Sequence, residues 1–302
     1  MLTNTEKQKI INHFGSAFYQ RMRFLLQKYT EMWCLEQVEW IEYLSVNCLF
    51  TCHSKIYGGS VLKICRPAKE VITEIQTLRE YDGTLFCKIF AFDIKDSVLL
   101  EEAITPGTPL RAVTSVEERI KIFLSLYAKL HISPKTPEKY PTYAGWVERI
   151  TNFMATQKAH TELYPYMRKA YDVFQRIHEK YNRTMLLHGD FHHDNILLGA
   201  DGLYTIIDPK GVVGDPILDI PRFILNECSD KRTYEENAQH IAHVIARISA
   251  GTSLPVEDIR NVFFVEMAMA NCWCVEDSEK PNMDDVKMAY GMLHCPDDSH
   301  RL

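Results

Sequence analysis

The 302-residue sequence predicts an α+β protein made of a small β-rich lobe and a larger, mainly helical lobe. Short runs of β-branched and aromatic residues dominate residues 40–101, whereas apolar residues at helical spacing dominate most of residues 111–302. Between them, residues 104–110 read Ile-Thr-Pro-Gly-Thr-Pro-Leu, and such a cluster of proline and glycine favours a hinge. We therefore expect an N-terminal lobe over 1–103, the hinge over 104–110 and a C-terminal lobe over 111–302.

The small lobe is expected to begin with a helix over residues 5–29, where apolar residues recur every three or four positions. The elements that follow are predicted in the order strand, strand, strand, helix, strand, strand, at 40–44, 48–52, 60–65, 67–81, 85–92 and 97–101. We expect the five strands to form one antiparallel sheet with the helix packed on it.

Composition excludes several classes of protein. Lys and Arg number 34 and Asp and Glu 40, and the formal charge of −6 argues against a nucleic-acid partner. The apolar stretch 262–275 contains Glu266 and is too short to span a membrane. Nine scattered cysteines and an N-terminus without a secretion-signal pattern predict a cytoplasmic protein in a reducing compartment. The oligomeric state is not determined by the sequence.

A β-like patch at residues 185–208 interrupts the helical lobe. Two apolar runs flank Asp201-Gly202, a preferred pair for a two-residue hairpin turn. Such a turn places Asn195 directly opposite Asp208, with Cβ atoms about 5 Å apart. An amide oxygen and a carboxylate at that separation can share Mg²⁺, so the sequence predicts a magnesium site there.

Asp190 lies five residues before Asn195 and directly after His188-Gly189. A carboxylate fixed in a loop beside a metal pair can accept a proton from an incoming hydroxyl. A second interpretation is a polar turn in which these side chains only cap backbone groups. A third is a metallohydrolase centre formed by residues of the same segment: His188, Asp190, His192, His193 and Asp194.

Lys63 lies on the third predicted strand, on the same face as Val61 and Cys65. The following predicted helix carries Glu74, with Glu70 and Glu80 as alternative partners. A lysine that neutralises nucleotide phosphates needs an anionic partner to hold its flexible side chain. The pair therefore indicates a nucleotide-phosphate site, although a lysine on an exposed strand edge would look the same.

Together these motifs resemble the aminoglycoside phosphotransferase family, which has the protein-kinase-like fold, and most of all its streptomycin 6-phosphotransferase and hydroxyurea-kinase branch. Residues 188–195 match the catalytic loop of the family, and residues 207–216, continuing to Asp219, match a run characteristic of that branch. Residues 99–107 resemble the hinge that receives adenine on its backbone. The resemblance extends over residues 38–225.

This resemblance implies a role for each motif residue. Asp190 would be the catalytic base, and Asn195 and Asp208 the Mg²⁺ ligands. The residues implied for ATP are Lys63 with Glu74 for the phosphates, the backbone of Glu101, Glu102 and Ala103 for adenine, and the Ser45 hydroxyl. Ser45 is included because the loop at 44–48 has no glycine to cradle phosphate through its backbone.

The function that follows is ATP-dependent phosphorylation of a hydroxyl on a small molecule, with a streptomycin-type aminoglycoside as the expected acceptor. Acidic residues expected to contact a cationic acceptor are Asp215, Asp219, Glu266, Glu276 and Asp277. Hydroxyurea or another small hydroxylated metabolite is the alternative acceptor. The metallohydrolase and a catalytically silent nucleotide-binding module are the alternative classes.

Overall fold

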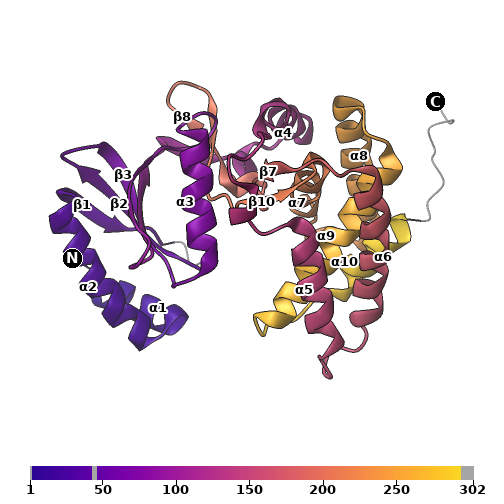
Figure 1. Ribbon diagram of the computed structural model, residues 1–302, viewed down its shortest axis with the longest axis horizontal. Coiled ribbons are helices and arrows are strands. Elements are labelled where there is room, and N and C mark those ends of the chain that lie inside the picture. Colours follow the sequence, from indigo (N-terminus) through magenta and orange to yellow (C-terminus); the bar gives the residue numbers. More distant parts are fainter. Residues whose placement is uncertain (1, 43–45, 294–302) are drawn as a thin grey trace. The chain divides into compact units, whose positions relative to one another are not determined.

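The computed structural model describes residues 2–42 and 46–293, which group into two compact units. The first unit consists of residues 1–108 and 197–210, and the second of residues 109–196 and 211–302. Figure 1 traces the helices and strands of each unit. Because residues 197–210 are far along the chain from the rest of the first unit, a linear division at a hinge could not assign them to it.

Two helices open the first unit, α1 (Asn4–Phe14) and α2 (Ser16–Met32). Gly15 separates them with a φ of 90°, a conformation that favours glycine and ends a helix. The single helix predicted over 5–29 is therefore wrong. The apolar spacing continues past Gly15 because both helices bury one face, although the backbone is broken between them.

The sheet of the first unit has five strands in the order β1-β2-β3-β5-β4, and each pairing in it is antiparallel. Its elements are β1 (Leu35–Trp40), β2 (Cys48–Ser54), β3 (Gly58–Ile64), α3 (Lys69–Tyr81), β4 (Ile89–Asp93) and β5 (Val98–Glu102). The predicted order of strands and helix is confirmed. The first strand lies earlier than the predicted 40–44 because it is a largely exposed edge strand with few apolar residues to reveal it.

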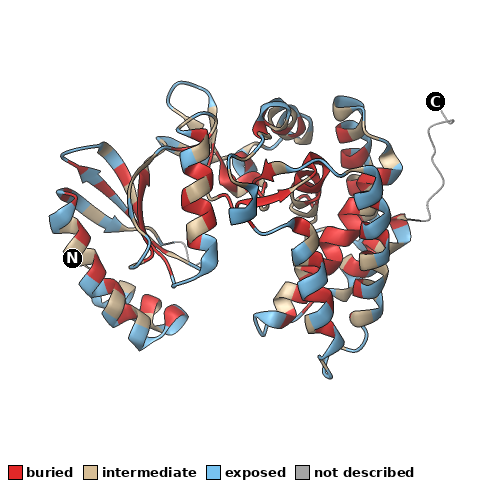
Figure 2. Cartoon of the chain, in the orientation of Figure 1, coloured by how far each residue is buried: buried red, intermediate tan, exposed pale blue. Residues whose placement is uncertain are grey.

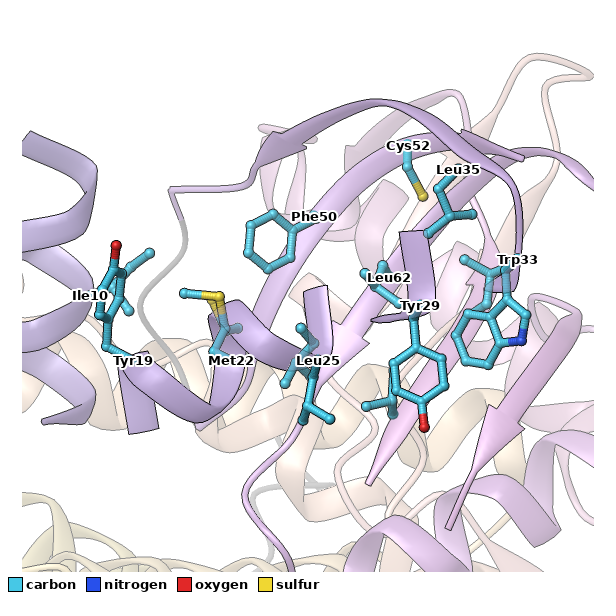
Figure 3. Close-up of a cluster of buried hydrophobic side chains, with 14 of the residues drawn as sticks. Ile10, Tyr19, Met22, Leu25, Tyr29, Trp33, Leu35, Phe50, Cys52 and Leu62 are labelled. Atoms are coloured by element: carbon cyan, nitrogen blue, oxygen red, sulfur yellow. The ribbon is translucent and has the colours of Figure 1, made fainter. Parts of the chain in front are cut away.

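The two faces of this sheet have different neighbours. Figure 3 shows Met22 and Leu25 of α2 beside Phe50 and Leu62 of the sheet, in a cluster that also includes Ile10 of α1. Helix α3 contributes Val71 and Ile75 to a separate cluster, in which it meets Cys65 and Leu99. Because side chains alternate along a strand, Lys63 lies on the face opposite Leu62.

A smaller sheet has the order β6-β8-β9, formed by β6 (Pro106–Pro109), β8 (Ile196–Gly199) and β9 (Tyr204–Ile206). At its hairpin, the N–H of Gly199 donates to the carbonyl of Leu203 (2.8 Å) and the N–H of Gly202 to the carbonyl of Gly199 (3.1 Å). The loop therefore has three residues, with Gly202 at positive φ. The predicted two-residue turn is wrong, and the register that placed Asn195 directly opposite Asp208 fails with it.

The second unit is mostly helical. Its strands β7 (Met185–Leu187) and β10 (Val212–Gly214) pair antiparallel. Its helices are α4 (Val116–Leu130), α5 (Tyr143–Ala155), α6 (Tyr164–Lys180), α7 (Ile220–Leu225), α8 (Tyr234–Thr252), α9 (Val256–Glu276) and α10 (Met283–Met292). Short 3₁₀ turns lie at Leu110–Ala112, Pro137–Lys139, His193–Asn195 and Pro216–Asp219. Helix α9 is buried along much of its length, as Figure 2 shows. No helix within the described part of the chain could cross a membrane.

The sheet–helix core of the first unit can be tested at Phe50, which is 1% exposed. Phe50→Ala is expected to lower the free energy of unfolding by about 3–5 kcal/mol because it leaves a cavity between the sheet and α2. Urea denaturation measures this change. The matched control is Phe24→Ala on α2, where the side chain is 68% exposed. Similar losses for the two variants would contradict the described packing.

Candidate active site

Lys63 is the centre of a buried charged cluster in the first unit. Its Nζ lies 2.5 Å from Oε1 of Glu74 and also contacts Oδ1 of Asp208. Glu74 projects from α3 toward β3, so it is the helix glutamate that holds the lysine. Both side chains are buried, at 4% and 8% exposure, whereas that of Asp208 is 29% exposed.

One lysine does not neutralise the carboxylates around it. Burial raises the pKa of Glu74 to about 8, against the opposing attraction of Lys63. Burial likewise raises the pKa of Glu101, whose buried Oε1 has no hydrogen-bond partner among the described residues. For Lys63, burial acts to lower the pKa, but Asp208, Glu74 and Glu101 raise it well above its usual range. Lys63 is therefore a fixed cation in an acidic cluster whose two buried glutamates favour their protonated forms.

Asp208 follows β9 and has a φ of 57°, a left-handed conformation that aspartate tolerates better than most residues. The hydroxyl of Thr73 on α3 donates to the carbonyl of Lys210 at 2.6 Å, which ties this segment to the helix. The Lys210 Nζ also lies 3.8 Å from Oδ2 of Asp208. Sequence reasoning did not single out Thr73 or Lys210.

The predicted adenine contact, the backbone of Glu101 to Ala103, lies at the end of β5. The N–H of Glu102 donates to the carbonyl of Lys88 (2.8 Å), and the N–H of Ala103 donates to the carbonyl of Gly59 (3.1 Å). Both N–H groups are therefore engaged within the first unit. Ser45, the other predicted nucleotide contact, lies outside the described residues.

In the second unit, the loop after β7 is held by a buried carboxylate. Asp219 accepts the backbone N–H groups of His188 (2.9 Å) and Gly189 (2.8 Å). Its Oδ2 also lies 3.0 Å from Nε2 of His131. Gly189 has a φ of 77°, and the N–H of Asp190 donates to Nδ1 of His188 at 3.1 Å. The backbone from His188 to Asp190 is thus held by hydrogen bonds to the side chains of Asp219 and His188.

Asn195 is tied to the same loop. Its Nδ2 donates to the backbone carbonyl of Asp190 at 2.9 Å, so its amide oxygen is the atom left to bind a metal. His192 lies beside both, with Nε2 at 3.6 Å from Oδ2 of Asp190. Taken singly, the two predicted metal ligands carry oxygen donors of the kind that Mg²⁺ prefers: an amide oxygen on Asn195 in the second unit and a partly exposed carboxylate on Asp208 in the first.

The histidines of this segment do not form the metallohydrolase centre. His193 stacks on Phe223 at 4.3 Å between ring centroids and contacts Glu227 at 2.8 Å. His188 and His192 each use Nδ1 to accept a backbone N–H of the loop. In the two described stretches of chain, no three His, Cys, Asp or Glu side chains are arranged to hold a metal ion. The metallohydrolase interpretation is therefore wrong.

Arg222 on α7 is a further residue that was not predicted from the sequence, and it contacts Asp190. Its Nε lies 3.2 Å from Oδ1 of Asp190, and its Nη2 lies 2.8 Å from Oε1 of Glu266. A signal was present in the sequence. Arg222 is the one charged residue in the apolar run Ile220–Leu225, and a largely buried cation in such a run needs anionic partners.

The acidic residues expected to contact the acceptor have other partners. Glu266 is 3% exposed, so it does not lie on a surface where an acceptor could contact it. Its carboxylate accepts a hydrogen bond from the Tyr143 hydroxyl at 2.6 Å. Asp215 pairs with Arg183, Asp219 holds the loop, and Glu276 pairs with Arg149. Asp277 is exposed at the end of α9.

The chain has the protein-kinase-like fold, which it shares with solved kinase structures. A family model described as "Aminoglycoside/hydroxyurea antibiotic resistance kinase" matches residues 51–278, well over half of the chain. The chain therefore belongs to the aminoglycoside/hydroxyurea antibiotic resistance kinase family, as the sequence motifs predicted.

Two curated relatives are similar to part of the chain. Streptomycin 6-kinase of Streptomyces griseus is 25% identical over 167 residues, which cover 53% of this chain and 53% of the relative. Streptomycin 3''-kinase of Klebsiella pneumoniae is 27% identical over 172 residues, which cover 55% of this chain and 60% of the relative. The chain thus spans little more than half the length of these relatives.

Solved structures share the fold over nearly the whole chain. Choline kinase LicA from Streptococcus pneumoniae has a TM-score of 0.66 and 15% identity, covering 91% of this chain and 97% of its own. A thermostable mutant of aminoglycoside phosphotransferase APH(4)-Ia, in a ternary complex with AMP-PNP and hygromycin B, has a TM-score of 0.59 and 14% identity, covering 90% and 95%. The predicted fold class is confirmed.

The acidic cluster around Lys63 gives a pH dependence that Glu101→Gln tests. Burial raises the pKa values of Glu101 and Glu74 in the folded protein above the value of an unfolded glutamate, which is about 4.3. The folded protein therefore binds these two protons more tightly than the unfolded chain does, and its stability falls as the pH rises. Glu101→Gln removes one buried carboxylate. We expect it to raise the melting temperature more at pH 9 than at pH 5, by about 2–4 °C.

Differential scanning calorimetry at the two pH values measures this difference. The control is Glu39→Gln, an exposed glutamate of β1 in the same unit. An equal effect of Glu101→Gln at both pH values, or a larger gain at pH 5, would contradict the acidic-cluster account.

Proposed function

We propose that the protein transfers the γ-phosphate of ATP to a hydroxyl of a small molecule, with Asp190 as the base. The observation that carries the proposal is the held loop of the second unit. Asp219 fixes the backbone before Asp190, and Asn195 is bonded to the carbonyl of Asp190 itself. A carboxylate held in this way is suited to orient a hydroxyl and accept its proton.

The groups proposed for the nucleotide belong to the first unit, except for Asn195. Lys63, held by Glu74, would contact the α- and β-phosphates, and Asn195 and Asp208 would be the ligands of Mg²⁺. When bound, Mg²⁺ offsets phosphate charge. The segment from Glu101 to Ala103 would meet adenine through carbonyl oxygens, since two of its N–H groups are engaged. Ser45 stays a prediction for the phosphate loop.

The reaction balances without a covalent enzyme intermediate. The acceptor oxygen forms a bond to the γ-phosphorus, the bond from that phosphorus to the β–γ bridging oxygen breaks, and ADP leaves with the electron pair. The acceptor proton passes to a carboxylate oxygen of Asp190. Lys63 offsets negative charge on the phosphates as ADP forms.

For the acceptor, we propose an aminoglycoside of the streptomycin type. The two streptomycin kinases that are similar to this chain support this choice, and the family description supports hydroxyurea as the alternative. Three of the five acidic residues predicted for the acceptor are buried, namely Asp215, Asp219 and Glu266. We therefore retain Glu276 and Asp277 for contact with a cationic part of the acceptor.

Asp190→Asn tests the base. The substitution keeps the shape of the side chain but removes its ability to accept the proton, so kcat is expected to fall by about 10²–10⁴-fold. The KM for ATP should stay within about twofold, because the first unit is unchanged. A coupled assay of ADP release measures both with streptomycin, other aminoglycosides and hydroxyurea as acceptors.

Asp201→Asn, in the exposed hairpin turn, is the matched control and should keep wild-type turnover. Near wild-type kcat in Asp190→Asn would exclude Asp190 as the base. Wild-type protein that binds ATP but turns over no acceptor would instead favour a catalytically silent nucleotide-binding module.

A further inference from the structure

The guanidinium of Arg222, which lies beside Asp190, contacts three side chains. Arg222 bridges two carboxylates, Asp190 on the loop and Glu266 on α9. Its guanidinium also lies over the ring of Trp273, 5.4 Å from the centroid, which is within the range of a cation–π interaction. Glu266 and Trp273 lie seven residues apart on α9, and therefore on one face of that helix.

These groups are the ones that recognise a cation. Two carboxylates and an aromatic face are what a guanidinium or ammonium ligand requires. The Tyr143 hydroxyl donates to the other oxygen of Glu266, so this carboxylate is held in place for its role. In this protein the cation that these groups bind is the guanidinium of Arg222, a residue of the chain itself.

Two atoms of this arrangement lack hydrogen bonds. Nε of Arg222 and Oε1 of Glu266 are buried and have no hydrogen-bond partner among the described residues, although both lie at ion-pair distance from opposite charge. Burial acts to lower the pKa of Arg222, but Glu266 and Asp190 raise it. The contact is therefore held by charge rather than by aligned hydrogen bonds, and a ligand cation of the same shape could replace it.

We propose that Arg222 is a positioning residue for Asp190, an internal cation that fills a guanidinium-binding place formed by Asp190, Glu266 and Trp273. The proposal rests on the proposed function in naming Asp190 as the base. Because Arg222 already lies between Asp190 and Glu266, a cationic group of the acceptor cannot bind there and must bind elsewhere on the protein.

Removal of Arg222 should open this place to a free cation. We expect Arg222→Ala to bind methylguanidinium in isothermal titration calorimetry and not to bind N-methylurea, its neutral counterpart of similar shape. Wild-type protein and Arg176→Ala, which alters an exposed arginine on α6, should bind neither. The double variant Arg222→Ala/Glu266→Gln should lose the methylguanidinium binding.

Turnover gives a second readout. Arg222→Ala is expected to lower kcat by about 10²-fold, because a misplaced catalytic group costs that much, with the KM for ATP within about twofold. Methylguanidinium, but not N-methylurea, should restore part of the kcat. Arg222→Lys should keep an intermediate kcat, since it retains the charge without the planar fork.

The binding and turnover experiments distinguish a failure of the proposed function from a failure of the role proposed for Arg222. If wild-type protein phosphorylates no acceptor, the proposed function fails, while the binding arm still decides the role of Arg222. Arg222→Ala that binds no methylguanidinium, or that keeps wild-type kcat, overturns the role proposed for Arg222. If Arg222→Ala does not fold, Arg222→Gln, which removes the charge but keeps most of the volume, is tested by turnover: kcat is expected to fall by about 10²-fold with the KM for ATP within about twofold, and wild-type kcat would overturn the role proposed for Arg222.

Discussion

The carboxylate of Asp219 is the contact on which the rest of the candidate site depends. A buried loop backbone must find hydrogen-bond partners, and Asp219 supplies them to the N–H groups of His188 and Gly189. With that backbone fixed, Asn195 can bond the carbonyl of Asp190, and Arg222 can reach its carboxylate. Asp219 is itself 1% exposed, so water does not compete for these bonds.

Both units place a cation among more carboxylates than it can neutralise. In the first unit Lys63 faces Glu74, Asp208 and Glu101, and in the second unit Arg222 faces Asp190 and Glu266. Because an ionised carboxylate is costly in a buried region, the pKa values of Glu74 and Glu101 are raised.

The features that depend on residues close together in the sequence could be predicted from it. The order of strands and helix in the first unit followed from periodicity, and the Lys63 site followed from one strand residue and one helix residue. The hairpin register was wrong because the αL conformation of Gly202 adds a third loop residue that composition does not reveal. The contact of Arg222 with Asp190 joins residues far apart in sequence, so only the fold brings it about.

The most direct test of the central claim follows the phosphorus itself. Wild-type protein is incubated with ATP, Mg²⁺ and streptomycin or another acceptor of the panel, and the reaction is followed by ³¹P NMR. Transfer to a hydroxyl predicts a new phosphomonoester resonance that grows one-for-one with ADP. Inorganic phosphate as the only new product with ADP, for every acceptor, would contradict the claim, and so would ATP that stays unchanged.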